Sequence, residues 1–307
     1  MRFAVESWAP DYGSPLELAE AGENDARGQA DVSVEVAAAN WQPIRPEATP
    51  ARTVVFVDGV QQMDARLWMN DDEGPSRMGV CVSLAAGTVL CNTSATVELV
   101  KVRRVAIGPA TLGEIDCGNG VIYYGVPAVD TSPAALDTIV RRQREDLEVA
   151  VAHNATAADL LVVDGHVRQR ETIAGAVGYL KTHQAQYLEP EQAAIVGRLK
   201  PGERTPVFLL ETPWSRYSWY LKLPGGEGHP WAGVIRCEAS TSLKPAEVSQ
   251  FADFVAATLP RFASEPHKEP RAPQNLYPIG GLERDMRRRL GDQGLLLRNL
   301  QRISRAS

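Results

Sequence analysis

The sequence predicts an α/β protein with a mixed β-sheet, and two observations lead to that prediction. Short apolar runs that are rich in β-branched residues recur along the chain and indicate buried strands. Apolar residues also recur at helical spacing over residues 133–153 and again over residues 244–259. Because two strands joined by a loop precede the first helix, we expect the sheet to begin as a hairpin meander.

The bulk properties are those of a globular protein. The chain has 307 residues, 44% of them hydrophobic and 23% charged, which allows one large domain or two smaller ones. It has no apolar stretch long enough to cross a membrane, and its N-terminus lacks the apolar core of a signal peptide, so a cytoplasmic location is expected. Its four cysteines lack metal-binding or disulfide-type spacing, which predicts buried, reduced thiols.

Residues 1–50 form an extension rich in Ala, Glu, Pro and Asp, with one short amphipathic segment at 15–20. The main domain is expected over residues 51–290. Its first strands are predicted at residues 54–57, 63–68 and 78–84. Short β-like pieces between turn residues then fill residues 85–130 and predict an inserted β-rich subdomain.

The character of the chain changes to helix at residue 133. Ser132 suits the N-cap of a helix over residues 133–153, and Pro133 suits its first turn. Further strands are expected at residues 160–163, in a short segment that ends at Lys181, and at 205–210, 217–223 and 232–238. Further helices are expected at residues 189–197 and 244–259, with a basic C-terminal helix over 281–307.

Two aspartates follow apolar strands, and each is followed by glycine. Asp58 comes directly after residues 54–57, and Asp164 directly after residues 160–163. We expect both at the carboxyl ends of strands, where two aspartates of one sheet can converge on one divalent metal. A single Asp-Gly pair is also common turn chemistry, so the repetition of the pattern carries the prediction.

A glutamate from the helix before Asp164 completes the predicted set. Glu148 lies at the edge of the helix's apolar stripe, whereas Glu145 lies further toward solvent. Both can instead be surface charges paired with nearby arginines. Lys181 can neutralise charge on a phosphate, or be an ordinary exposed lysine at a strand end.

Such carboxylates form a hard, anionic site suited to Mg²⁺ or Mn²⁺. Two metals in such a site can stabilise the attacking water and the leaving oxygen of a phosphodiester displacement. No phosphate-binding G-x-x-x-x-G-K-[ST] motif is present, so hydrolysis of ATP by this chain is not expected.

The net charge of −6 disfavours nucleic acid as a partner on average, but charge can be local. Residues 281–307 contain seven arginines and three acidic residues, and we expect Arg287, Arg288 and Arg289 to contact DNA. Arg103 and Arg104 are a second candidate phosphate contact, although an exposed arginine pair can serve solubility alone.

The order of these motifs resembles that of the NurA nuclease family over residues 50–290. The motifs are Val57-Asp58-Gly59, the helix that bears arginines and glutamates, Val163-Asp164-Gly165, Gly178-Tyr179-Leu180-Lys181, Trp219-Tyr220-Leu221-Lys222-Leu223, Ile235-Arg236-Cys237-Glu238 and Tyr277-Pro278. The resemblance implies an RNase H-like core with helices on both faces of the sheet. It further implies a Mn²⁺-dependent DNA nuclease that acts from 5′ ends and on single strands. It also implies a homodimer and a hexameric HerA-type ATPase as partner in the repair of double-strand breaks.

The same resemblance assigns site residues. The metal ligands fall on Asp58, Asp164 and a helix glutamate, with Glu148 as first choice and Glu145 as second. The family's C-terminal motif has a tyrosine followed eight residues later by a histidine or an aspartate, which here gives Tyr277 and Asp285. Asp285 can equally pair with Arg288 or Arg289, and Tyr277 can equally be a packed aromatic residue before a proline.

Three functions remain open from the sequence. The first is a metal-dependent DNA nuclease. The second is a catalytically weak subunit that binds DNA ends or docks the ATPase. The third is a phosphohydrolase of small nucleotides. The arginine-rich tail disfavours this third function, because many arginines suit a polymeric substrate.

Overall fold

The computed structural model describes residues 29–69, 76–182, 187–226 and 228–305. The amphipathic segment predicted at residues 15–20 lies outside these ranges. Within them, the strands form a mixed sheet of eleven strands in the order β1-β9-β10-β11-β8-β7-β2-β3-β4-β6-β5. The prediction of a mixed sheet with helices is therefore confirmed. Contacts divide the chain into two compact units, Met1–Phe56, Leu90–Ala95 and Thr156–Gly280 in the first, and Val57–Val89, Thr96–Ala155 and Gly281–Ser307 in the second.

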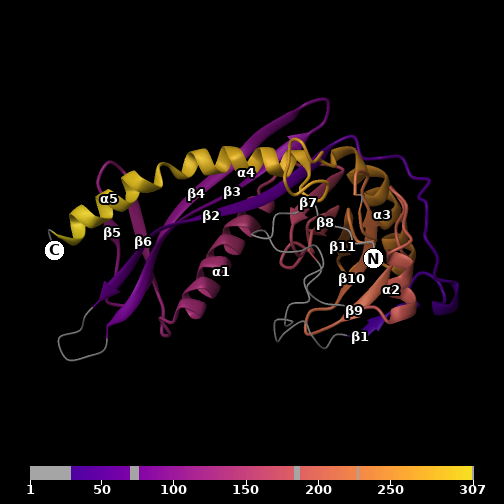
Figure 1. Ribbon diagram of the computed structural model, residues 1–307, viewed down its shortest axis with the longest axis horizontal. Coiled ribbons are helices and arrows are strands. Elements are labelled where there is room, and N and C mark those ends of the chain that lie inside the picture. Colours follow the sequence, from indigo (N-terminus) through magenta and orange to yellow (C-terminus); the bar gives the residue numbers. More distant parts are fainter. Residues whose placement is uncertain (1–28, 70–75, 183–186, 227, 306–307) are drawn as a thin grey trace. The chain divides into compact units, whose positions relative to one another are not determined.

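In its described part, the first unit contains six neighbouring strands of the sheet and two α-helices (Figure 1). Its strands are β1 (Gln29–Asp31), β7 (Leu160–Asp164), β8 (Ala176–Leu180), β9 (Phe208–Glu211), β10 (Arg216–Lys222) and β11 (Val234–Ala239). Its helices are α2 (Pro190–Val196) and α3 (Pro245–Thr258), with 3₁₀ turns at Ala38–Asn40 and Leu259–Phe262. Strands β7 and β8 are parallel, whereas β8, β11, β10 and β9 pair antiparallel.

The core of the first unit follows from the apolar runs seen in the sequence. Every residue of β10 and β11 is buried, so these strands lie in the middle of the sheet with both faces covered. Helix α3 packs through Phe251 against Trp219 of β10, with ring centroids 6.3 Å apart and planes at 82°.

The second unit contains the longest strands of the protein's described part. Three of them belong mostly to this unit: β2 (Val54–Met69) apart from residues 54–56, β3 (Arg77–Cys91) apart from residues 90–91, and β4 (Ala95–Gly108) apart from residue 95. Strands β5 (Ile115–Asp116) and β6 (Ile122–Pro127) follow. The helices are α1 (Pro133–Ala152), α5 (Gln293–Ser304) and α4 (Tyr277–Leu290) from residue 281 onward. In Figure 1, α4 and α5 run along one side of the long strands and α1 along the other. Leu300 of α5 packs with Ala65, Cys81, Ala106 and Tyr123 of the strands.

Helix α1 begins where the sequence predicts. Ser132 is its N-cap, whose hydroxyl accepts a hydrogen bond from the Ala135 N–H, and Pro133 occupies the first turn. The buried stripe includes Leu136, Val140, Leu147 and Val151. This amphipathic spacing, together with the cap, explains why the helix could be placed from the sequence alone.

Two local predictions are corrected by the structure. The short pieces expected over residues 85–130 are mainly parts of long strands, β3 and β4, which continue the same sheet. Gly87 lies inside β3, where a Cβ would lie 2.8 Å from the Leu99 carbonyl oxygen, so glycine permits a close approach of β4. The C-terminal segment forms two helices, α4 and α5, because the chain breaks at Gly291, which has a φ of 91°.

The state of the cysteines and the character of the helices were also predicted from the sequence. All four cysteines are free and buried, as the sequence predicts. Among the described residues, no helix combines the length and the apolar character that crossing a membrane requires.

Candidate metal centre

Asp58 lies inside a strand rather than at its end. Strand β2 runs from Val54 to Met69, so the predicted strand end at Asp58 is wrong. Residues 54–57 are fully buried, and Asp58 is only 6% exposed. The Gly59 N–H donates a hydrogen bond of 2.8 Å to Asp58 Oδ1. The carboxylate is therefore fixed on a rigid, buried stretch of backbone.

Gly59 serves the approach of helix α1, not a turn. A Cβ at Gly59 would lie 2.3 Å from Glu148 Oε1 and 2.8 Å from Glu148 Cγ, which is closer than real contacts allow. Glu148 is 6% exposed, and its Oε1 pairs with Arg144 Nε at 3.1 Å. Glu145, three residues earlier on α1, is exposed. Of the two predicted glutamates, only Glu148 thus lies against the backbone beside Asp58.

Asp164 is the last residue of β7, as predicted, and it has a cation beside it. Lys181 Nζ lies 2.5 Å from Asp164 Oδ2, with side chains only 11% and 18% exposed, respectively. The same ammonium donates to Asn275 Oδ1 at 2.7 Å. Lys181 is therefore not an ordinary exposed lysine, which was one of the two readings of the sequence.

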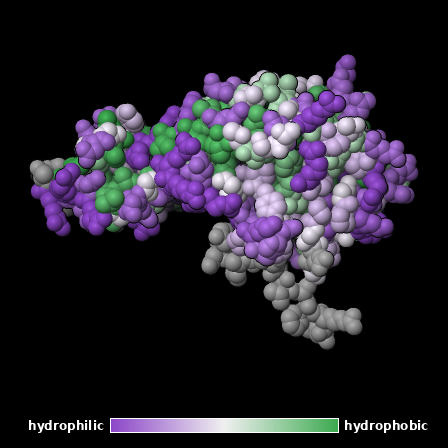
Figure 2. Space-filling view, turned by 90° about the horizontal axis from the view of Figure 1, so that it is seen from above, coloured by the Kyte–Doolittle hydropathy of each residue, from purple (hydrophilic) through white to green (hydrophobic). Residues whose placement is uncertain are grey.

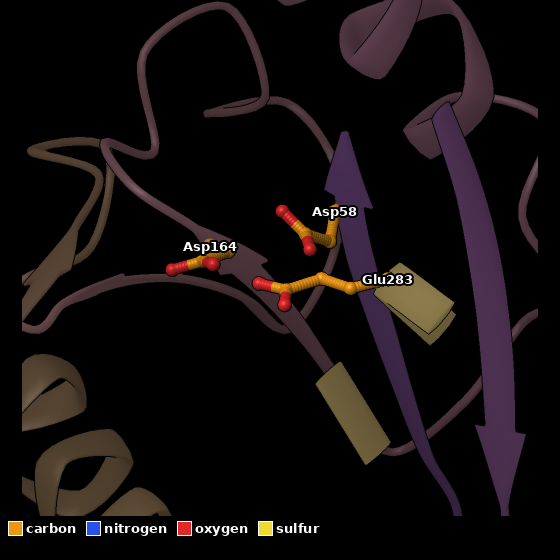
Figure 3. A group of neighbouring side chains, drawn as sticks. All are labelled: Asp58, Asp164 and Glu283. Carbon is orange, nitrogen blue, oxygen red and sulfur yellow. The ribbon is translucent and has the colours of Figure 1, made fainter. Parts of the chain in front are cut away.

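Three carboxylates meet in one group. Asp58, Asp164 and Glu283 each offer an oxygen, and these oxygens all lie within 4.8 Å of one another. Figure 3 shows the three side chains, which come from β2, from the end of β7 and from α4. Carboxylate oxygens at such spacing are the ligands that Mg²⁺ and Mn²⁺ prefer, so the residues fit a hard divalent cation.

The C-terminal motif is only partly where the resemblance placed it. Asp285 accepts a hydrogen bond of 2.8 Å from Arg289 Nε, one helical turn away, and it is not a member of the carboxylate group. Glu283 takes its place in that group. Tyr277 is the first residue of α4 and is 36% exposed, and its hydroxyl accepts a hydrogen bond of 3.2 Å from the Glu265 N–H.

The spacing of apolar residues in α4 is a sequence signal that favours Glu283 as a site residue. Ile279, Leu282, Met286 and Leu290 form the buried stripe of α4. At about 100° of rotation per residue, Glu283 lies closer to the centre of this stripe than Asp285 does. The helical wheel therefore favours Glu283 as the inward carboxylate.

The arginines predicted to bind DNA differ in their surroundings. Arg103 and Arg104 are neighbours on β4, and neighbouring strand residues point to opposite faces. Arg104 Nη2 donates to the Leu290 carbonyl oxygen at 2.9 Å and so caps the end of α4. Three more are exposed on α4: Arg287, Arg288 and Arg289.

The sequence reasoning also missed an ionic cluster around the buried Glu238 of β11. Glu238 is fully buried, and its Oε1 accepts a hydrogen bond from Arg216 Nε at 2.7 Å and lies 3.2 Å from Arg236 Nη2. Its Oε2 lies 3.0 Å from His166 Nδ1. Burial alone would raise the pKa of Glu238, but the charge of Arg236, the contact with His166 and the charge of Arg216 lower this pKa to about 2.

A glycine makes this cluster possible. Gly178 of β8 pairs with Val163 on one side and Glu238 on the other. A Cβ at Gly178 would lie 2.7 Å from the Val167 nitrogen, so only glycine lets the segment after Asp164 fold back over β8. Because an ionised carboxylate only accepts hydrogen bonds, Glu238 sets the proton of His166 on Nδ1.

In comparisons with known proteins, no protein-family model and no curated sequence matches this chain. The assignment of a function therefore depends on the residues themselves.

Proposed function

We propose that this chain is a metal-dependent nuclease that hydrolyses phosphodiester bonds in DNA, with Mn²⁺ as its cofactor and Mg²⁺ as a possible substitute. The observation that carries the proposal is the group formed by Asp58, Asp164 and Glu283. Each comes from a different element, so the fold brings three carboxylates together, an arrangement that a divalent cation would stabilise.

The carboxylates and the lysine of the site have different proposed roles. Asp58, Asp164 and Glu283 would hold the metal, and Glu148 stands against Gly59 beside them. When bound, a divalent metal lowers the pKa of its water and stabilises charge on the phosphate and the leaving oxygen. Lys181 lies beside Asp164, where its ammonium is suited to an anionic phosphate.

A polymer substrate is favoured by the arginines of α4 and α5. Seven arginines are exposed on these helices or at the C-cap of α5: Arg284, Arg287, Arg288, Arg289, Arg298, Arg302 and Arg305. Each can neutralise one phosphate, and such contacts supply affinity without sequence preference. Figure 2 shows hydrophilic residues interspersed with apolar ones around α5 on the face seen from above. A phosphohydrolase of small nucleotides would not use so many cations.

The proposal includes the biological setting that the motif order implies. The substrate would be DNA ends and single strands during double-strand break repair, and the protein would act as a homodimer with a hexameric HerA-type ATPase. Helix α5 exposes Leu295 and Leu297, 55% and 38% accessible, which offers apolar surface for such an assembly.

The experiment is a cleavage assay with the purified full chain. Labelled single-stranded and duplex oligonucleotides are incubated with Mn²⁺, with Mg²⁺ or with EDTA, and a chromogenic nucleotide phosphodiester is incubated in parallel. The proposal expects metal-dependent cutting of DNA and little turnover of the small ester. Turnover of the small ester alone would support the phosphohydrolase, and DNA binding without any cutting would support the end-binding or docking subunit.

A further inference from the structure

The metal-ligand candidate Asp164 has a cation supplied by the chain itself. Lys181 Nζ lies 2.5 Å from Asp164 Oδ2, and both side chains are largely withdrawn from solvent. At this distance the ammonium donates a charge-assisted hydrogen bond and neutralises much of the carboxylate's charge. Asp164 is thus not a bare anion in the metal-free protein.

The ammonium is held from a second side by Asn275. Its Oδ1 accepts a hydrogen bond of 2.7 Å from Lys181 Nζ, and the Asn275 side chain is fully buried. The segment before it is fixed by Tyr179, whose hydroxyl donates to the Gln274 carbonyl oxygen at 2.6 Å. Tyr179 pairs with Asp164 in the parallel register of β7 and β8. Asn275 and Lys181 are therefore located by the same two strands that locate Asp164.

We propose that Lys181 is the resident cation of Asp164, which a divalent metal must displace, and that Asn275 retains the ammonium nearby. This inference rests on the metal site of the proposed function. An ammonium and a divalent cation that share one carboxylate repel each other, so the resident lysine lowers the affinity of the site for metal. Once released from Asp164, Lys181 stays hydrogen-bonded to Asn275 and is available to the phosphate of the substrate.

A different role for Lys181 makes the opposite prediction. If the lysine only orients Asp164, as residues behind a metal ligand commonly do, its removal loosens the site and weakens metal binding. If it competes with the metal, its removal strengthens metal binding while cleavage still falls, because the phosphate loses its cation. The sign of the change in metal affinity therefore separates the two roles.

The test measures binding of Mn²⁺ alone to the full chain, without DNA, from the electron paramagnetic resonance signal of free Mn²⁺. Lys181→Met is compared with wild type and with Lys200→Met, a control on an exposed lysine. We expect Lys181→Met to bind Mn²⁺ about tenfold more tightly and to cleave DNA more slowly, and Lys200→Met to change neither. Asn275→Ala, which removes one anchor of the ammonium, should shift the affinity in the same direction by less.

Mn²⁺ affinity that is unchanged or weaker in Lys181→Met overturns the inference. If circular dichroism shows that this variant does not fold, Asn275→Ala decides by the direction of its shift. Asp164→Asn distinguishes a failure of the inference from a failure of the proposed function. Wild-type binding that Asp164→Asn leaves intact, or no wild-type binding at all, would remove the metal site itself and the nuclease with it.

Discussion

Asp58 of β2 and Glu283 of α4 bring carboxylate oxygens within 4.8 Å of each other, although they lie far apart in the chain. Asp58 is buried on a rigid strand, and Glu283 flanks the buried stripe of its helix. Two carboxylates this close repel each other, and a bound divalent cation would reduce that repulsion and stabilise the folded protein.

The first prediction compares Glu283 with Asp285 on the same helix. Glu283→Gln should weaken Mn²⁺ binding by at least about tenfold, since it removes one of three ligands. Asp285→Asn should leave the affinity unchanged, because the Asp285 carboxylate pairs with Arg289 instead. Calorimetric titration with Mn²⁺ checks both. Loss of affinity in Asp285→Asn alone would restore the position that the motif spacing indicated.

The sequence was sufficient to predict the position of Asp164 in the fold, but it was not sufficient, by motif spacing, to choose the carboxylate of α4. Asp164 could be placed at a strand end because a wholly apolar run precedes it and a glycine follows. The choice between Glu283 and Asp285 depends on which side of α4 is buried, and a motif counted by spacing does not contain that information. The buried stripe at Ile279, Leu282, Met286 and Leu290 does contain it.

The glycines explain most of the other differences. Gly59 was expected just beyond the end of a strand, yet it lies inside β2, and Gly87 lies inside β3. Their function is to admit Glu148 in one case and the backbone of β4 in the other. Such close approaches join segments distant in sequence, so local turn chemistry could not predict them. Asn275 and Glu238 were missed for the same reason: each acts through a partner from another element.

The second prediction concerns the contact between Gly59 and Glu148. Gly59→Ala should destabilise the protein by about 1–3 kcal/mol, because its Cβ overlaps the Glu148 carboxylate. In a Glu148→Ala background the same substitution should cost less, and a double-mutant cycle from urea unfolding measures the difference. Gly281→Ala is the control, since nothing lies within 4 Å of the added Cβ on this helical glycine. Strictly additive effects of the two substitutions would contradict the contact.

The third prediction follows from the low pKa of Glu238. Its stabilising contribution is fully present above the ordinary pKa of 4.5 and is lost as pH falls toward its folded pKa of about 2. Glu238→Gln removes the carboxylate that pairs with both Arg216 and Arg236 and should destabilise the protein by about 3 kcal/mol at pH 7.

Urea unfolding of wild type and Glu238→Gln between pH 7 and pH 2 checks the sign. The difference in unfolding free energy should be constant at neutral pH and should shrink below about pH 4.5. Glu114→Gln, on an exposed glutamate, should show no such dependence. A difference that grows as the pH falls would mean that Glu238 is not the stabilised anion.

The fourth prediction separates the two neighbouring arginines of β4. Arg104→Ala should destabilise the protein by about 1 kcal/mol, because the end of α4 loses its cap at Leu290. Arg103→Ala should leave stability unchanged but weaken DNA binding and reduce the slope of log affinity against log salt by about one. Fluorescence anisotropy over a salt series measures this slope. An unchanged slope would exclude Arg103 as a phosphate contact.

The most direct test of the metal-dependent nuclease is cleavage of labelled DNA by Asp58→Ala beside wild type, in Mn²⁺ and in EDTA. We predict that wild type cuts only with metal and that Asp58→Ala does not cut. We also predict that this variant unfolds at the same or a higher urea concentration, because one anion of a repulsive group is gone. Mn²⁺-dependent cleavage that persists unchanged in a folded Asp58→Ala protein would contradict the account.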